Sequence, residues 1–240
     1  MDILHGKYGI IPACDLTGLK ELVKLVKETC SLDFIQAYKI GVRMLALEGA
    51  KKIVQEIRRF TDLPIIYDHQ KYGTDIPDLS GGDILESLKN AGIDGLIIFP
   101  FAGIRTLKAT VEGCRRANLL PIVGGEMTHP GFLVSEGGYI ADSAPAKIYR
   151  DAAHLGVDTF VVPGTKINKI KEYAKLIGDI VPSPRLMFPG VGKGQSGDIA
   201  AAFKAALPYK CSAIVGRGIY AAPNIGSAAA ALWERASSVL

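Results

Sequence analysis

Short apolar runs alternate with longer amphipathic segments along the whole chain, and this alternation limits the folds that it can adopt. The segments between the runs place apolar residues at helical spacing, as Leu19, Leu22 and Val26 do in the first. Strands separated by helices pair in parallel through right-handed crossovers. Eight such units in 240 residues predict a closed (β/α)8 barrel with an eight-stranded parallel sheet. The predicted strands are residues 10–15, 34–40, 63–68, 95–100, 120–126, 159–163, 185–189 and 211–216.

The connecting segments complete the predicted barrel. Residues 131–143 are its longest irregular loop, and residues 189–197 form a glycine-rich loop. No linker or change of composition divides the chain, so residues 1–240 are expected to form one barrel domain. The predicted helices are residues 19–30, 49–60, 84–90, 104–117, 145–155, 167–176, 199–207 and 227–239.

Composition excludes several functional classes. A hydrophobic fraction of 48% supplies a large core, and the 28 Lys and Arg residues are dispersed, so neither disorder nor nucleic-acid binding is expected. The net charge of +4 suits a small anionic ligand. Four well-separated cysteines argue against zinc or disulfides and favour a reducing cytoplasm. We expect no membrane association, because no signal peptide and no apolar stretch of spanning length is present.

Three charged residues follow the third predicted strand: Asp68, Lys71 and Asp75. In barrels, the carboxyl ends of the strands carry the catalytic groups, and alternating carboxylates and ammonium groups there can hold one another in unusual protonation states. The same spacing also fits one face of a helix, where the three residues would form a solvated ion-pair ladder. Gly73 and Pro77 disfavour a continuous helix, so we interpret the segment as a functional site.

Other predicted strands also end in polar residues. Asp15 and Lys39 end the first two, and the loops after the last two combine the glycine-rich segment 189–197 with Gly216 and Arg217. Barrel phosphate sites are commonly built from these last two loops, where glycines admit the backbone and arginine supplies two parallel donors. The loop is not of the Walker type, because Lys193 is not followed by Ser or Thr.

With these motifs in order, the chain resembles orotidine 5′-phosphate decarboxylases, especially their short archaeal-type form, over almost its full length. The resemblance implies a homodimeric barrel that needs neither metal nor organic cofactor. It also implies decarboxylation of orotidine 5′-monophosphate to UMP and CO2 in pyrimidine biosynthesis. The motifs that carry it are Ala13-Cys-Asp-Leu16, Tyr38-Lys-Ile-Gly41, Asp68…Lys71…Asp75-Ile-Pro77, Glu126-Met-Thr-His-Pro-Gly131, Pro189-Gly-Val-Gly192 and Ile214-Val-Gly-Arg-Gly-Ile-Tyr220.

The resemblance also implies a role for each matching residue. Lys71 would stabilise the carbanion that CO2 leaves and then supply its proton, while Asp68 would lie against the substrate carboxylate. Lys39 and Asp75 would complete the catalytic charge network, with Asp75 and Ile76 reaching in from the partner subunit. The substrate-binding residues would be Asp15 for the ribose hydroxyls, Thr128 at the pyrimidine edge, Ile76 from the partner subunit, and Gln195, Gly216 and Arg217 at the phosphate.

The strand-three motif departs from the usual Asp-x-Lys-x-x-Asp-Ile-Pro pattern of the family. One extra residue stands on each side of Lys71. Because strand residues three apart face opposite sides, Lys71 can join Asp68 only if a bulge or early turn re-aims it, and His69, Gln70 and Gly73 are suitable positions. The phosphate loop is one residue longer than the family pattern.

Two other functions fit parts of the sequence. One is a related Mg²⁺-dependent sugar-phosphate enzyme, such as a hexulose phosphate synthase or a ketogulonate phosphate decarboxylase, which shares the Asp-x-Lys-x-x-Asp motif. The other is a barrel that binds nucleotides but has lost its chemistry, as the altered lysine spacing permits. The Asp-Ile-Pro and Glu-Met-Thr-His-Pro motifs favour decarboxylation. His69 is expected at a bulge or at the rim, with a catalytic role as the alternative, and His129 is expected to position its loop.

Overall fold

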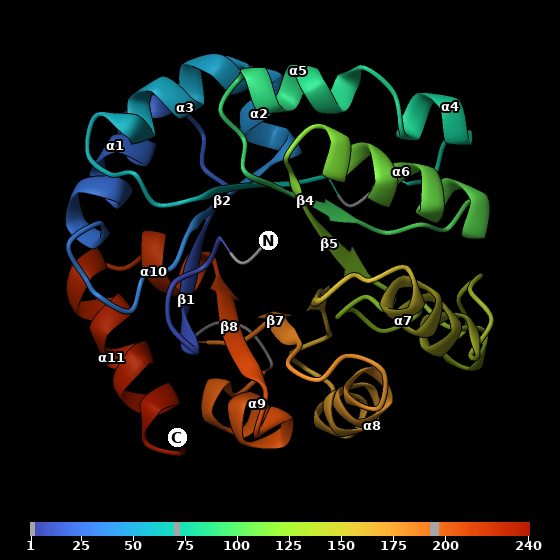
Figure 1. Cartoon of the computed structure of the whole chain (residues 1–240). Helices are drawn as coiled ribbons and strands as arrows, with labels where there is room; N and C mark the ends of the chain where they lie inside the picture. The colour runs from blue at the N-terminus through green and yellow to red at the C-terminus, as the bar shows by residue number, and fades with distance from the viewer. Residues whose placement is uncertain (1–2, 70–72, 193–196) are drawn as a thin grey trace.

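The computed structural model, which describes residues 3–69, 73–192 and 197–240, contains one closed barrel of parallel strands in sequence order (Figure 1). Each described strand pairs with its neighbours in the chain, and β8 closes the barrel against β1. The predicted (β/α)8 barrel is therefore confirmed. The strands are β1 (Tyr8–Cys14), β2 (Tyr38–Gly41), β3 (Ile65–Asp68), β4 (Gly95–Ile98), β5 (Leu120–Gly124), β6 (Thr159–Val161), β7 (Arg185–Pro189) and β8 (Lys210–Val215).

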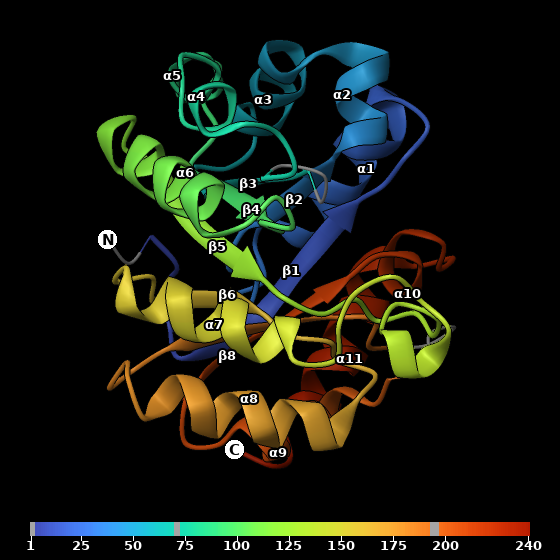
Figure 2. The same ribbon diagram turned by 90° about the vertical axis from the view of Figure 1, so that its right-hand side faces the viewer.

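Helices surround the barrel, as the two perpendicular views show (Figures 1 and 2). None of those described has the length and apolar character needed to cross a bilayer. Eight of the described helices were predicted. The helices α4, α10 and the 3₁₀ helix η1 are too short to leave a periodic pattern, and α2 buries only Met44 and so lacks an apolar face. The helices are α1 (Leu19–Thr29), α2 (Val42–Glu48), α3 (Ala50–Arg58), α4 (Pro77–Ser80), α5 (Ile84–Asn90), α6 (Ile104–Arg116), η1 (Val134–Glu136), α7 (Ala144–His154), α8 (Ile167–Gly178), α9 (Ile199–Ala206), α10 (Arg217–Tyr220) and α11 (Ile225–Ser237).

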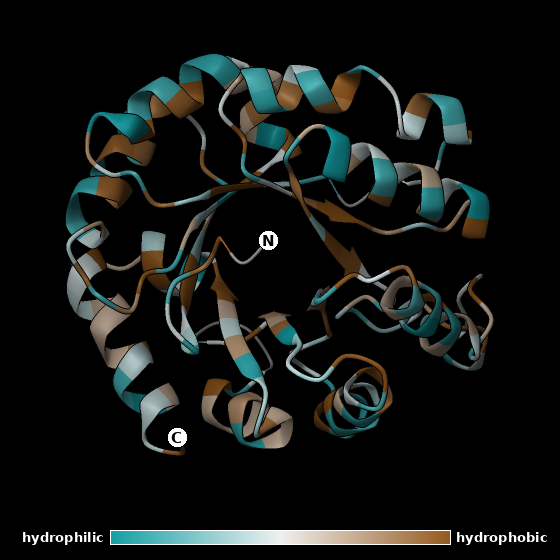
Figure 3. Ribbon diagram, viewed as in Figure 1, coloured by the Kyte–Doolittle hydropathy of each residue, from teal (hydrophilic) through white to brown (hydrophobic). Residues whose placement is uncertain are grey.

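The apolar side chains form two separate layers. The larger layer lies between strands and helices and includes Leu22 and Phe203, and the helices turn their hydrophilic faces outward (Figure 3). The smaller layer includes Ile11, Ile66 and Ile97, which come from three different strands. Because side chains alternate along a strand, one set of positions packs inside the barrel and the other packs under the helices.

Several predicted strand boundaries need correction, and β4 and β6, like β5, end two residues before their predicted ends. β2 begins at Tyr38 rather than at residue 34, although Ile35 still makes an isolated bridge to Ile10. β5 ends at Gly124, short of the predicted 126, because the chain leaves the sheet there. Glu126 therefore lies outside the strand, and its side chain points toward α8, where it accepts a hydrogen bond from Tyr173.

A buried polar network closes the amino end of the barrel. Arg185 donates to the carbonyl oxygens of Leu4 at 3.2 Å and Gly6 at 2.8 Å, and to Ser212 Oγ at 3.2 Å. Ser212 in turn donates to Gln36 Oε1 at 2.7 Å. The N-terminal segment is thereby held across this end, and the carboxyl end is left for a ligand.

Candidate active site

Lys39 lies between two carboxylates at the carboxyl end of the barrel. Its Nζ is 2.9 Å from Asp68 Oδ2 and 3.2 Å from Asp15 Oδ1. The side chains of Lys39 and Asp68 are only 7% and 10% exposed, whereas Asp15 is 44% exposed. The structure thus brings together three residues that the sequence analysis placed on different strands.

Strand register explains why these residues meet. Ala13 pairs with Lys39, and Lys39 pairs with Ile66. Asp15 and Asp68 lie two residues beyond Ala13 and Ile66, so both side chains point inward above the interior apolar layer. Gly41 makes room for the cluster, because a Cβ there would lie 2.6 Å from Asp15 Oδ1.

The charges in this cluster are unequally matched. Burial opposes a positive charge on Lys39, but the Asp68 and Asp15 carboxylates outweigh it and raise the pKa of Lys39 above its usual range. Lys39 therefore stays protonated at neutral pH. Asp68 Oδ1 is buried and accepts no hydrogen bond from any residue that the structure describes. An unpaired carboxylate oxygen beside a cavity is ready to accept a bond from a cation or a ligand.

A cavity of about 520 Å³ opens above the cluster. This volume falls within the range of about 300–1,000 Å³ that is typical of small-molecule sites. Asp15, Lys39 and Asp68 line it together with Phe101 and Met127. It therefore combines a charged floor with apolar and aromatic walls, which suits a planar heterocycle carrying a negative group.

The loops after β5 and β7 lie against each other beside this cavity. Gly190 has a φ of +82°, and a Cβ there would meet Thr165 at 2.9 Å and Thr128 at 3.1 Å. The carbonyl of Thr128 accepts a 3.0 Å hydrogen bond from Thr165 Oγ1. The described ends of the glycine-rich loop are joined, because Gly192 N donates to Gly197 O at 3.0 Å. Thr128 is thus fixed at a crowded junction of three loops.

The remaining predicted site residues occupy several places. Gly216 lies between β8 and α10, and Arg217 begins α10 with its side chain exposed. Asp75 and Ile76 precede α4 and are exposed, with Ile76 at 59%. Lys71 and Gln195, including the expected bulge before Lys71, lie outside the described residues.

The alternative of one helix carrying Asp68, Lys71 and Asp75 is wrong. Asp68 is the last residue of β3, and Asp75 lies before α4. Across residues 3–69, 73–192 and 197–240, no three His, Cys, Asp or Glu side chains are grouped as metal ligands would be.

Comparison with known proteins identifies the family. The family model described as orotidine 5′-phosphate decarboxylase / HUMPS family matches residues 9–232. The chain belongs to this family. The resemblance predicted from the motifs is therefore confirmed.

Individual members of the orotidine 5′-phosphate decarboxylase / HUMPS family match over nearly the whole chain. The orotidine 5′-phosphate decarboxylase of Methanosarcina mazei is 31% identical and is covered over 96% of both chains. That of Methanocaldococcus jannaschii is 31% identical over 88% of this chain and 91% of its own. A crystal structure of the M. jannaschii orotidine 5′-monophosphate decarboxylase with the inhibitor BMP superposes with a TM-score of 0.81 at 26% identity. That match covers 96% of this chain and 99% of the other.

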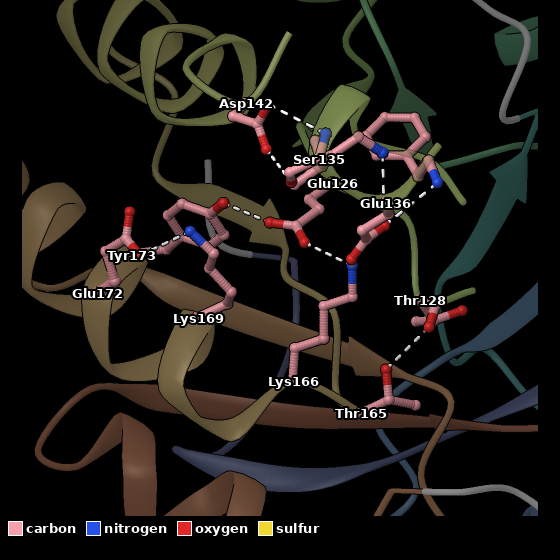
Figure 4. Close-up of polar contacts among 12 residues, drawn as sticks. Glu126, Thr128, Ser135, Glu136, Asp142, Thr165, Lys166, Lys169, Glu172 and Tyr173 are labelled. Atoms are coloured by element: carbon pink, nitrogen blue, oxygen red, sulfur yellow. Dashed lines mark hydrogen bonds and ion pairs between the residues drawn. The ribbon is translucent and has the colours of Figure 1, made fainter. Parts of the chain in front are cut away.

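A second charged cluster was missed by the sequence analysis (Figure 4). Lys166 Nζ lies 2.8 Å from Glu126 Oε1 and 2.7 Å from Glu136 Oε1, and Tyr173 donates its hydroxyl to Glu126 Oε2. A weak signal was present, because Lys166 stands a few residues beyond the end of β6, whereas Lys39 and Asp68 lie within their strands. Without the fold, nothing linked it to Glu136, thirty residues earlier.

Proposed function

We propose that this protein decarboxylates orotidine 5′-monophosphate to UMP and CO2 in pyrimidine biosynthesis. The observation that carries the proposal is the cluster at the floor of the cavity, in which the buried Lys39 and Asp68 meet the partly exposed Asp15, in a chain that belongs to this family. The test is direct: CO2 release from orotidine 5′-monophosphate, measured alongside UMP titration. UMP binding without CO2 release would leave only a nucleotide-binding barrel.

In the proposed chemical step, Asp68, Lys39 and Lys71 each have a different role. The bond between the pyrimidine ring and its carboxylate breaks, CO2 leaves, and the electron pair stays on the ring carbon. We assign Lys71 to stabilise this carbanion and to transfer its proton to the same carbon. Lys39 holds Asp68 through the 2.9 Å contact, and we propose that the Lys71 ammonium pairs with Asp68 Oδ1, which accepts no bond from the described part of the chain.

The role of Lys71 has a sharp test. Lys71→Ala should abolish CO2 release and leave UMP affinity nearly unchanged, because the ammonium acts on charge that develops in the transition state. Lys210→Ala, in β8, provides a matched loss of one lysine. Wild-type turnover in Lys71→Ala would assign the proton to another group.

We assign the phosphate to Arg217, Gln195 and the Gly216 backbone. The exposed Arg217 side chain and the joined ends of loop 190–197 support this assignment. Arg217→Ala should raise the UMP dissociation constant at least about tenfold, since a charge-assisted hydrogen bond contributes about 1.5–3 kcal/mol. Arg59→Ala, at an exposed position just after α3 and before β3, is the control. An unchanged constant would place the phosphate elsewhere.

We propose a homodimer whose subunits share their sites, with Asp75 and Ile76 reaching the partner's cavity. A second cavity of about 690 Å³ is lined by Asp75, Leu79 and Ile84, and it shares Thr74 with the first cavity. Ile76 and Leu79 are both 59% exposed and Ile84 is 51% exposed, an apolar surface that a second copy would cover.

Shared sites can be tested by mixing two inactive variants. Lys39→Ala and Asp75→Ala subunits should together regain about a quarter of wild-type activity, because half of the randomly formed dimers carry one intact site. The absence of any recovery after proven subunit exchange would show that each subunit builds its own site.

Two further expectations concern conditions. EDTA and added Mg²⁺ should leave turnover unchanged, and a metal requirement would favour the sugar-phosphate enzymes of the same family. We also place the reaction in the cytoplasm, which is supported by four cysteines without disulfide bonds.

A further inference from the structure

The loop that follows β5 is a braced unit. Within it, Val134 N donates to Ile140 O at 2.8 Å and Gly138 N donates to Leu133 O at 2.7 Å. Ser135 and Asp142 are joined through backbone and side-chain hydrogen bonds (Figure 4). A segment braced in this way moves as one body, so its position depends on where it is attached to the barrel.

Lys166 provides that attachment at two points, one near the start of the loop and one in its middle. It bonds Glu126 before Thr128, and it bonds Glu136 after it. Glu136 Oε2 in turn accepts from the backbone N–H groups of Phe132 at 3.2 Å and Leu133 at 3.4 Å. The adjacent Thr165 adds the bond to the Thr128 carbonyl. One short segment after β6 therefore holds the loop at several points around Thr128.

The position of Lys166 is not explained by helix stability. It immediately precedes α8 and makes no side-chain cap, and a cation is unfavourable at a helix N-terminus. Hydrogen bonds from Lys166 to both glutamates nevertheless outweigh its partial burial and raise the pKa of Lys166. Glu126 is fully buried at its side chain, so its charge needs this partner.

We propose that Lys166 is a positioning residue that sets the distance between Thr128 and the pyrimidine of the nucleotide. The inference rests on the proposed function, which places the pyrimidine at Thr128. The loop also reaches the cavity wall, because the Phe132 ring packs 5.7 Å from the ring of Phe101. A displaced loop therefore weakens recognition of the base and leaves the phosphate and ribose contacts intact.

The experiment compares UMP with ribose 5-phosphate, which lacks the base. Lys166→Met should raise the UMP dissociation constant about tenfold and that of ribose 5-phosphate less than about twofold, a selective loss worth ~1 kcal/mol or more. Lys166→Arg should recover most of the UMP affinity, because it restores a cation between the two glutamates. Lys175→Met, at an exposed position on α8, is the matched control and should change neither constant.

A second variant keeps the test decisive if Lys166→Met unfolds. Glu136→Ala releases the loop without leaving a buried charge, since Glu136 is a surface residue, and it should show the same selective loss. Equal weakening of both ligands, or unchanged UMP affinity in Glu136→Ala, would overturn the proposal. Wild-type CO2 release is measured separately, so failure of the proposed function is distinguishable from failure of this inference.

Discussion

Two lysines in this barrel each lie between two carboxylates, yet their surroundings differ. Lys39 contacts Asp15 and Asp68 at the floor of a cavity, and one oxygen of Asp68 is left without a partner among the described residues. Lys166 contacts Glu126 and Glu136, and both oxygens of Glu126 are bonded. The sequence signal is similar in the two cases: a charged residue at or just beyond a strand end.

The difference teaches how to separate reactive from supporting charge clusters. A buried carboxylate whose bonds are all made is held in one place and has nothing left to offer a ligand. A buried carboxylate with an unmet bond at a cavity carries an energetic cost that a ligand or a catalytic cation can relieve. By this criterion, the Lys39 cluster is the reactive one and the Lys166 cluster supports a loop.

The largest expected effect separates the two lysines directly. Lys39→Met should lower kcat at least about a thousandfold, because it leaves Asp68 misplaced at the reacting end of the substrate. Lys166→Met should change kcat by less than about fivefold at saturating substrate and act on KM instead. Steady-state kinetics on both variants measures this, with circular dichroism to confirm folding. Comparable kcat losses in Lys39→Met and Lys166→Met would mean that the two clusters do not differ as reactive and supporting.

The second comparison removes one carboxylate charge from each cluster. Asp68→Asn should abolish most turnover and cost less stability than Glu126→Gln, because removing the buried, unmatched charge at Oδ1 offsets part of the ion pair lost to Lys39. Glu126→Gln should cost about 1–3 kcal/mol of unfolding free energy, because its charge-assisted bond to Lys166 is broken in a dry site, and it should retain kcat. Urea unfolding and initial rates provide both values. A larger stability loss in Asp68→Asn than in Glu126→Gln would contradict our account.

Most of the fold was predictable because the barrel repeats one local pattern. Each strand is a short apolar run, and each long helix keeps an apolar face such as that of Leu22 and Val26. The helices α4 and α10 were not predicted, since a single turn shows no period, and α2 was not predicted because it buries only Met44 and so has no apolar face. The end of β5 was misplaced for a related reason: residues 125 and 126 remain buried after pairing stops.

The site was predictable only where residues stand at strand ends. The carboxyl-end rule placed Asp15, Lys39 and Asp68 on one rim, and strand register then brings them into contact. The Lys166 cluster depends on a tertiary contact between segments thirty or more residues apart, which no local pattern encodes. The place of Lys71 beside Asp68 stays a prediction.

A smaller effect is expected from the single neutral hydrogen bond that holds the Thr128 carbonyl. Thr165→Val removes the donor to the Thr128 carbonyl and should raise the UMP dissociation constant about threefold, the value of a bond worth about 0.5–1 kcal/mol. Thr61→Val is the control, because Thr61 accepts from Leu63 N in the loop before β3, at the other end of the barrel. An equal rise of the UMP dissociation constant in both variants would mean that the loss of affinity is not specific to the bond at Thr128.

The smallest expected effect concerns pH. The hydrogen bond from Lys166, followed by those from the Leu133 and Phe132 backbone, lowers the pKa of Glu136 below its ordinary value of 4.5. A lowered folded-state pKa means that Glu136 stabilises the protein above pH 4.5, and that this contribution is lost as pH falls through the folded-state pKa.

The melting temperature of wild type should therefore exceed that of Glu136→Gln at about pH 6, and the difference should shrink below the ordinary carboxyl range and vanish in stronger acid. Glu112→Gln, at an exposed carboxylate on α6, controls for general loss of charge. A difference that persists unchanged in strong acid would show that Glu136 holds the loop by shape rather than by charge. In that case, charge would not be what holds the loop in the Lys166 cluster, unlike in the Lys39 cluster.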